Sequence, residues 1–388
     1  MTVNNLQIGD KAVLESGNLQ KLFDALNEEN YTLVGPTVSD EAIVYDELSS
    51  VEDLPRGWVD EQDGGIYRLK RREDNAYFGF AVGPHSWKKY LHPPIKKLFS
   101  AKKDSKGFKI NSVSENIPKY AFIAVRACEL NAISIQDNVF INGNYTDPYY
   151  KSVRENVFII AVNCGHAGGT CFCVSMDAGP KAESGFDLSL TEIIKSDQHQ
   201  FLVEIGTEKG LKILDQIPLN DVTSGIIKTA ESIIDKTASA MGREMNTEGI
   251  KDLLYRNYEN KSWDEVADRC LTCANCTMVC PTCFCTTVED VTDLSGEYTE
   301  RIQKWDSCFT LDFSYLHGGS VRYKAKSRYR QWMTHKLATW IDQFGSSGCV
   351  GCGRCITWCP VAIDITEEVS KIRHSEKINL EESGNDEN

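Results

Sequence analysis

The chain of 388 residues lacks several features that would place it in common classes of protein. Its first residues show no basic segment followed by an apolar one, so no export signal is expected. No apolar run approaches the roughly 20 residues that a membrane helix needs, and the sequence therefore predicts a cytoplasmic protein without a membrane span. HExxH, GxSxG, P-loop and GxGxxG motifs are also missing. These absences argue against hydrolytic catalysis and against binding of flavin or nicotinamide by this chain itself.

Composition and charge narrow the class further. With 41% hydrophobic and 25% charged residues, the chain is not predicted to be disordered as a whole. A net charge of −14 disfavours nonspecific nucleic-acid binding as its main role. At about 150 residues per domain, the length predicts two or three domains.

The 15 cysteines are unusual in number and in distribution. None occurs before Cys128, four lie between Cys128 and Cys173, and eleven lie between Cys270 and Cys359. In a reducing compartment, an odd number of cysteines is a poor disulfide framework but a good set of metal ligands. The distribution also indicates that the chain has two regions.

Apolar periodicity predicts an α+β multidomain fold. Residues 1–215 are expected to form an α/β domain, with strands at residues 31–35, 120–125, 156–162 and 201–205 and a helix within 15–30. Residues 216–374 are expected to form a mainly helical domain, with helices at 221–241, 247–258 and 322–344. The polar, acidic tail at 375–388 is predicted to be disordered.

The C-terminal region contains two copies of the cysteine run of bacterial ferredoxins, C-x2-C-x2-C-x3-C-P. The first copy consists of Cys270, Cys273, Cys276 and Cys280, and the second of Cys349, Cys352, Cys355 and Cys359. In such runs the first three thiolates sit on one tight loop, and the fourth binds the other cluster. We therefore assign Cys270, Cys273, Cys276 and Cys359 to one 4Fe–4S cluster, and Cys349, Cys352, Cys355 and Cys280 to a second.

Structural zinc is the alternative for these cysteines, because thiolates also bind zinc well. Zinc usually takes two separated Cys-x2-Cys pairs, whereas three cysteines at successive spacings followed by Cys-Pro are typical of clusters. The long insertion between Cys280 and Cys349 indicates an enlarged, helical version of the compact ferredoxin fold. Gly351 and Gly353 permit close approach of the backbone to cluster sulfurs.

The four cysteines of the first region are a possible third metal centre. Cys128, Cys164, Cys171 and Cys173 lie close in sequence, and a glycine-rich loop after a predicted strand joins Cys164 to Cys171. A third iron–sulfur cluster is one interpretation, and small buried apolar side chains are the other.

Three cysteines and one basic run remain. Cys283, Cys285 and Cys308 are too few for a further cluster, so we expect them to pack around the first two or to join ligands from the N-terminal half. The basic run from Arg322 to Arg330, followed by His335 and Lys336, is interpreted as a solvated helix face. A docking surface or a positive field beside anionic clusters is the alternative.

Several further motifs accompany the cysteines along nearly the whole chain. They are Gly83-Pro-His-Ser-Trp87, Arg126-Ala-Cys-Glu129, Thr170-Cys-Phe-Cys173, Ser175-Met176, Gly185-Phe-Asp-Leu188, Trp305-Asp-Ser-Cys-Phe309, Tyr329-Arg-Gln-Trp332, His335-Lys336 and the run from Gly348 to Pro360. In these motifs the chain resembles the iron–sulfur beta subunits of cytoplasmic NAD(P)-linked nickel–iron hydrogenases, the sulfhydrogenases. That family also includes the electron-input subunit of anaerobic sulfite reductase.

The resemblance implies a protein that transfers electrons and carries no catalytic residue of its own. Its partners would be a flavin subunit that handles NAD(P)H, together with the small iron–sulfur and large nickel–iron subunits of a hydrogenase. Two alternatives remain open. One is the electron-input subunit of a siroheme sulfite reductase, and the other is a subunit that reduces sulfur or polysulfide at the Cys128–Cys173 site.

Overall fold

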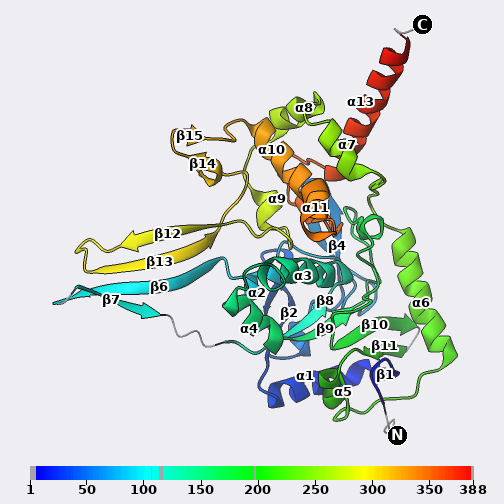
Figure 1. Ribbon diagram of the computed structural model, residues 1–388. Coiled ribbons are helices and arrows are strands. Elements are labelled where there is room, and N and C mark those ends of the chain that lie inside the picture. The colour runs from blue at the N-terminus through cyan, green and yellow to red at the C-terminus, as the bar shows by residue number, and fades with distance from the viewer. Residues whose placement is uncertain (1–5, 106, 113–116, 196–197, 386–388) are drawn as a thin grey trace.

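The computed structural model describes residues 6–105, 107–112, 117–195 and 198–385. In Figure 1 a large sheet with its covering helices lies at one end of the molecule, and a group of helices that includes α10, α11 and α13 lies at the other. A smaller sheet of long strands extends to one side. The expectation of mixed helix and strand content is confirmed.

The large sheet has seven strands, of which the inner four are parallel. The spatial order is β1 (Lys11–Glu15), β11 (Gln198–Ile205), β10 (Leu188–Lys195), β9 (Phe158–Val162), β8 (Tyr120–Val125), β2 (Thr32–Ser39) and β3 (Ala42–Glu47). Pairings among β10, β9, β8 and β2 are parallel, and β1, β11 and β3 are added antiparallel. All four predicted strands lie in this sheet, and residues 120–125 coincide with β8.

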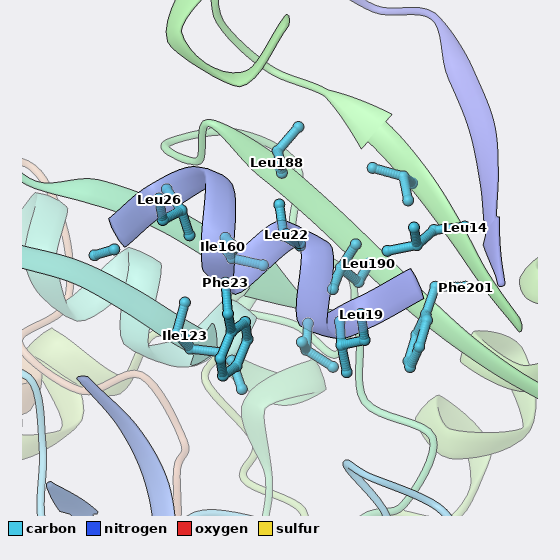
Figure 2. Packing of buried hydrophobic residues seen from close by; sticks show 14 of the residues in the cluster. Leu14, Leu19, Leu22, Phe23, Leu26, Ile123, Ile160, Leu188, Leu190 and Phe201 are labelled. Atoms are coloured by element: carbon cyan, nitrogen blue, oxygen red, sulfur yellow. The ribbon is translucent and has the colours of Figure 1, made fainter. Parts of the chain in front are cut away.

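Helices cover both faces of this sheet, which explains why its inner strands are continuously apolar. On one face, Phe23 of α1 (Leu19–Glu28) packs with Ile123 and Ile160, as Figure 2 shows. On the other face, α3 (Ala127–Phe140) and α4 (Pro148–Asn156) cover Phe122 and Ile159. Neighbouring residues of one strand thus point into different cores, as the alternation of strand side chains requires.

The second group of helices forms a separate core around tryptophan and tyrosine side chains. It consists of α7 (Ile250–Arg256), α8 (Ser262–Arg269), α10 (Ala325–Thr334) and α13 (Ile365–Asn385), whereas Trp340 of α11 (Trp340–Phe344) packs in a neighbouring cluster with Val350. A π-helical turn, η5 (His335–Thr339), joins α10 to α11, so the helix predicted at 322–344 is present from residue 325. It ends at Gly345, which adopts a left-handed conformation with φ of 72°.

The insertion between the two cysteine motifs contains a β-hairpin that the helical prediction missed. Strands β12 (Thr286–Thr292) and β13 (Tyr298–Trp305) pair with β6 (Ile95–Asp104) and β7 (Gly107–Ser112) of the N-terminal region. The β-branched residues of β12 favour a strand, and the Asp293 side chain accepts hydrogen bonds from the backbone of Glu297 and Tyr298 in the turn. This four-stranded sheet therefore crosses the predicted boundary at residue 215.

Two further elements differ from the predicted division of the chain. Helix α6 (Ser224–Ser239) packs its Ala230 on Ile193 and Leu202 of the large sheet, although it follows residue 215. Helix α13 continues to Asn385 and so includes most of the tail at 375–388. Glu376 bonds to Arg256 and Asn257, which fixes the start of a segment whose polar composition alone suggested disorder.

The remaining elements are short. They are η1 (Ser16–Asn18), η2 (Val51–Asp53), β4 (Trp58–Asp63), β5 (Ile66–Arg71), α2 (Lys88–Leu91), η3 (Cys173–Met176), α5 (Glu208–Leu214), α9 (Asn275–Met278), η4 (Asp312–Ser314), β14 (Tyr315–Leu316), β15 (Gly319–Ser320) and α12 (Arg354–Thr357). Among the described residues, no helix has both the length and the apolar character needed to cross a membrane.

Replacing Leu22 tests the core between α1 and the sheet. Leu22 is fully buried, so Leu22→Ala should lower the free energy of unfolding by about 2 to 5 kcal/mol, because the lost contacts leave a cavity. Lys21→Ala on the exposed side of the same helix is the control and should change it by less than about 0.5 kcal/mol. Urea denaturation followed by circular dichroism measures the free energy of unfolding of both variants. Equal losses for Leu22→Ala and Lys21→Ala would contradict the packing of α1 on the sheet.

Candidate metal centres

The two cysteine motifs fold into loops of the same backbone conformation. In each loop the residue before the second cysteine and the residue after it adopt positive φ: Thr272 and Ala274 in the first, Gly351 and Gly353 in the second. A one-turn helix then follows, α9 in the first motif and α12 in the second, and these two helices lie against one another. The tight loops place three cysteines of each motif around one space, as the sequence predicts.

The first cavity contains the cysteines assigned to the first cluster. Cys270, Cys273 and Cys276 of the first motif line it together with Cys359 of the second. Cys355 also reaches this cavity, so it lies between the two groups. Cys273 is exposed, and the cavity therefore approaches the surface of the protein.

The second cavity contains the other four assigned cysteines. Cys349, Cys352 and Cys355 line it together with Cys280 of the first motif. Cys280 and Cys352 are buried, so this group lies deeper in the protein than the first. In both cavities the fourth cysteine thus comes from the other motif.

Backbone amides point at several of these sulfurs. The amide of Thr272 donates to Cys270 Sγ at 3.4 Å, and the amide of Ile363 donates to Cys359 Sγ at 3.3 Å. Burial raises the pKa of Cys349 to about 12, although a hydrogen bond from the Gly351 amide acts in the opposite direction. Such amides stabilise negative charge on sulfur, which suits thiolate ligands of a cluster.

Two buried side chains at the first cavity have polar atoms without a partner. Tyr329 and Trp332 line it, and neither the Tyr329 hydroxyl nor Trp332 Nε1 forms a hydrogen bond within the described part of the chain. Both side chains are buried, and buried donors are almost always bonded in native proteins. Sulfur atoms of a cluster would accept these bonds, so the cavity fits such a group. The sequence motif Tyr329-Arg-Gln-Trp332 gave no role for either residue.

A buried lysine stands beside the second cavity. Lys336 Nζ lies 3.2 Å from Cys280 Sγ, 2.9 Å from Thr282 Oγ1 and 3.1 Å from the carbonyl oxygen of Gly348. A hydrogen bond from Cys283, followed by the charge of Lys336, lowers the pKa of Cys280 well below its usual value. Lys336 therefore does not belong to a solvated helix face, which was the favoured interpretation of the basic run.

The four N-terminal cysteines gather next to the second motif. Cys128 and Cys173 share one buried cluster with Cys352, and Cys171 and Cys164 lie close enough to Cys173 to influence its charge electrostatically. Burial raises the pKa of Cys173 to about 12. The structure thus brings the four predicted residues together and places them on the side of the second cavity.

A buried ion pair joins these two parts of the chain. Arg354 Nη2 lies 2.5 Å from Glu129 Oε1, and both side chains are 1% exposed. Glu129 also accepts hydrogen bonds from Tyr45 at 2.7 Å and from Trp87 at 3.1 Å. Sequence reasoning missed this pair, although both residues lie in motifs that it had singled out.

The last three cysteines lie beside the predicted ligands. The Cys283 thiol forms a hydrogen bond with Cys280. Cys285 and Cys308 lie near the base of the β12–β13 hairpin, and the charge of Cys285 helps to raise the pKa of Cys308. Burial, followed by the charge of Cys308, raises the pKa of Cys276 in the first cavity. Across the described ranges, no three His, Cys, Asp or Glu side chains are arranged to hold a single metal ion.

Comparison with known proteins shows what this chain is similar to. Residues 269–363 match the family described as 4Fe-4S dicluster domain. The chain is 33% identical over 287 residues to sulfhydrogenase 2 subunit beta of Pyrococcus furiosus, which covers 72% of this chain and 83% of that protein. No solved structure gave a significant match.

Gly353 offers a test of the contact between the second motif and the N-terminal region. A methyl group on Gly353 would overlap the carbonyl oxygen of Thr170, so Gly353→Ala should separate the two segments and lower the thermal midpoint of unfolding. Gly249→Ala is the matched control, because Gly249 also has positive φ but open space around it. Both variants carry the left-handed penalty of about 1 to 2 kcal/mol. A midpoint no lower for Gly353→Ala than for Gly249→Ala would contradict the close approach.

Proposed function

Because the chain belongs to the family of sulfhydrogenase beta subunits, we propose that it carries electrons through two 4Fe–4S clusters within a cytoplasmic nickel–iron hydrogenase complex. An iron–sulfur electron-transfer role follows from the family. We propose in addition that the clusters number two and that the complex is a hydrogenase. The observation that supports it best is the composition of the two cavities, each with three cysteines of one motif and the last of the other.

The proposed ligands are the eight cysteines of the two motifs. Cys270, Cys273, Cys276 and Cys359 would hold the first cluster, and Cys349, Cys352, Cys355 and Cys280 the second. When bound, the clusters supply one-electron chemistry. The protein supplies thiolates, amide donors and a largely buried environment. Each motif would also provide the fourth ligand of the other motif's cluster, so that the two clusters would lie close together.

The N-terminal cysteines would hold a third iron–sulfur centre. Cys128 and Cys173 border Cys352, and Cys164 and Cys171 lie near Cys173, so the second cluster would stand between the first and the third. The electron path would then be linear. It would approach the surface at Cys273, where exposed Leu271 provides apolar contact area for another subunit.

The proposed partners follow from the family and not from the geometry of this chain. We propose a flavin subunit that handles NAD(P)H, together with the small iron–sulfur and large nickel–iron subunits of the complex. In domain terms, residues 1–215 would carry the third centre and residues 216–374 the first two clusters, with the β6–β7 and β12–β13 hairpins shared between them.

Iron analysis of paired cysteine variants tests the crossed ligation. Anaerobically purified protein should contain at least about eight irons per chain and show reducible paramagnetic signals. Cys359→Ser should remove about four irons, and adding Cys270→Ser should remove no more, because both residues hold one cluster. Adding Cys349→Ser to Cys359→Ser should instead remove about four further irons.

Cys285→Ser is the matched control for this series and should keep the iron content of the wild type. The contrary result would be that Cys359→Ser and Cys349→Ser combined remove no more iron than either change alone. Each motif would then hold its own cluster, and the crossed assignment would be wrong. Zinc in place of iron, with no reducible signal, would overturn the proposed function itself.

The third centre makes a separate prediction. Wild-type protein should then contain about twelve irons, and Cys171→Ser should lower the number to about eight while leaving the signals of the two motif clusters unchanged. Iron assay and electron paramagnetic resonance measure both quantities. A wild-type content of about eight that Cys171→Ser does not change would refute the third centre and leave the two-cluster proposal standing.

A further inference from the structure

The two cavities differ in the kind of group that their surroundings direct at the cysteines. At the second cavity, the ammonium group of Lys336 bonds directly to Cys280 Sγ at 3.2 Å, and the lysine is 5% exposed. Its other two partners, Thr282 Oγ1 and the Gly348 carbonyl oxygen, are neutral. The positive charge of Lys336 is therefore directed at the cysteine ligand, and no carboxylate among the described residues is in hydrogen-bond contact with it.

The wider π-helical turn gives Lys336 this position. Three successive residues of η5, Lys336, Leu337 and Ala338, are all buried. A regular α-helix at the surface of a protein would expose part of each turn. Such turns are often found at functional sites. The ammonium group enters the space between Cys280 and Gly348, the residue just before the second motif.

A second buried lysine reaches the same side of this cavity. Lys88 is 4% exposed, its Nζ lies 3.9 Å from the Trp305 ring centre, and it donates to the carbonyl oxygen of Cys283 at 3.1 Å. Arg354 is also close to the second motif, but its charge is balanced by Glu129 at 2.5 Å. Of these three cations, Lys336 is the one that donates to a proposed ligand of the second cluster and forms no ion pair within the described part of the chain.

The first cavity presents neutral donors instead. The Tyr329 hydroxyl and Trp332 Nε1 face it, and among the described residues no lysine or arginine forms a hydrogen bond to Cys270, Cys273, Cys276 or Cys359. The side chain of Arg328, whose charge acts on Cys270, donates its hydrogen bonds to the backbone carbonyl oxygens of Phe309 and Tyr323. A neutral donor stabilises negative charge less than a buried ammonium group does.

We propose that Lys336 makes the cluster at Cys280, Cys349, Cys352 and Cys355 the more easily reduced of the two motif clusters. This inference rests on the proposed function. Reduction adds one electron to a cluster, with no bond formed or broken, and the electron comes from the partner subunit or, in a titration, from dithionite. The fixed positive charge stabilises the added electron strongly because little water surrounds it. Of the two motif clusters, the second is therefore the more favourable position for the electron.

The test is a redox titration of the full chain followed by electron paramagnetic resonance. Lys336→Gln removes the charge but keeps a donor for Thr282 and Gly348, whereas Lys336→Arg keeps the charge. Lys336→Gln should lower one of the two midpoint potentials, changing the ratio of reduced to oxidised cluster about tenfold at fixed potential, which is about 59 mV for one electron. Lys336→Arg should change this midpoint potential much less. Neither variant should move the midpoint potential of the other motif cluster.

Two controls assign the effect. Lys251→Met removes a positive charge from an exposed ion pair with Asp342 and should move neither potential. Tyr329→Phe removes the neutral donor of the first cavity and should move only the potential that Lys336→Gln leaves unchanged. Joining Lys336→Gln to Cys359→Ser keeps only the second of the two motif clusters, and the lowered potential should be the one that remains.

The outcomes separate this inference from the function on which it rests. Wild-type protein without two reducible clusters would refute the proposed function. Two reducible clusters whose potentials Lys336→Gln does not move, or moves together, would refute the role of Lys336 alone. Loss of iron from Lys336→Gln would also refute it, because Lys336 would then be needed to retain the cluster and not to set its potential.

Discussion

The buried ion pair between Arg354 and Glu129 holds the second cysteine motif against the N-terminal half of the chain. Both side chains are removed from water, and removing one partner of such a pair typically costs about 3 to 5 kcal/mol, because the other charge is left buried. Arg354 also donates to the carbonyl oxygens of Gly83 and His85, so the guanidinium group connects three segments. The positions of the second cavity and of the N-terminal cysteines relative to each other depend on this contact.

Close approach of backbones completes the same junction. The loop of Gly351 and Gly353 lies directly on Phe172 and Thr170, and the amide of Phe172 donates to the carbonyl oxygen of Gly351 at 2.8 Å. Glycine is required here for two reasons, since both residues have positive φ and neither position has room for a Cβ. Cys128 and Cys173 consequently pack beside Cys352, although they come from a distant part of the sequence.

Much of this arrangement could be predicted from local patterns. Continuous apolar runs identified β8 and β9, and cysteine spacing identified both the motif loops and the residues that line each cavity. The sequence could not show the pairing of β6 with β13, because strand pairing depends on residues that are far apart in the chain. It also could not distinguish Lys336 from the exposed cations of the same basic run. That difference arises only when η5 packs against Cys280 and Gly348.

The shared four-stranded sheet has a consequence for synthesis of the protein. Strand β6 leaves the ribosome about 200 residues before its partner β13, which at about 5 to 20 residues per second is a delay of roughly 10 to 40 seconds. During that interval the β6–β7 hairpin has an open edge and carries exposed Phe108 and Ile110. The lysines of β6, Lys96, Lys97, Lys102 and Lys103, repel a second copy of the same edge. The nascent chain is thus protected from pairing with its neighbours until its own hairpin arrives.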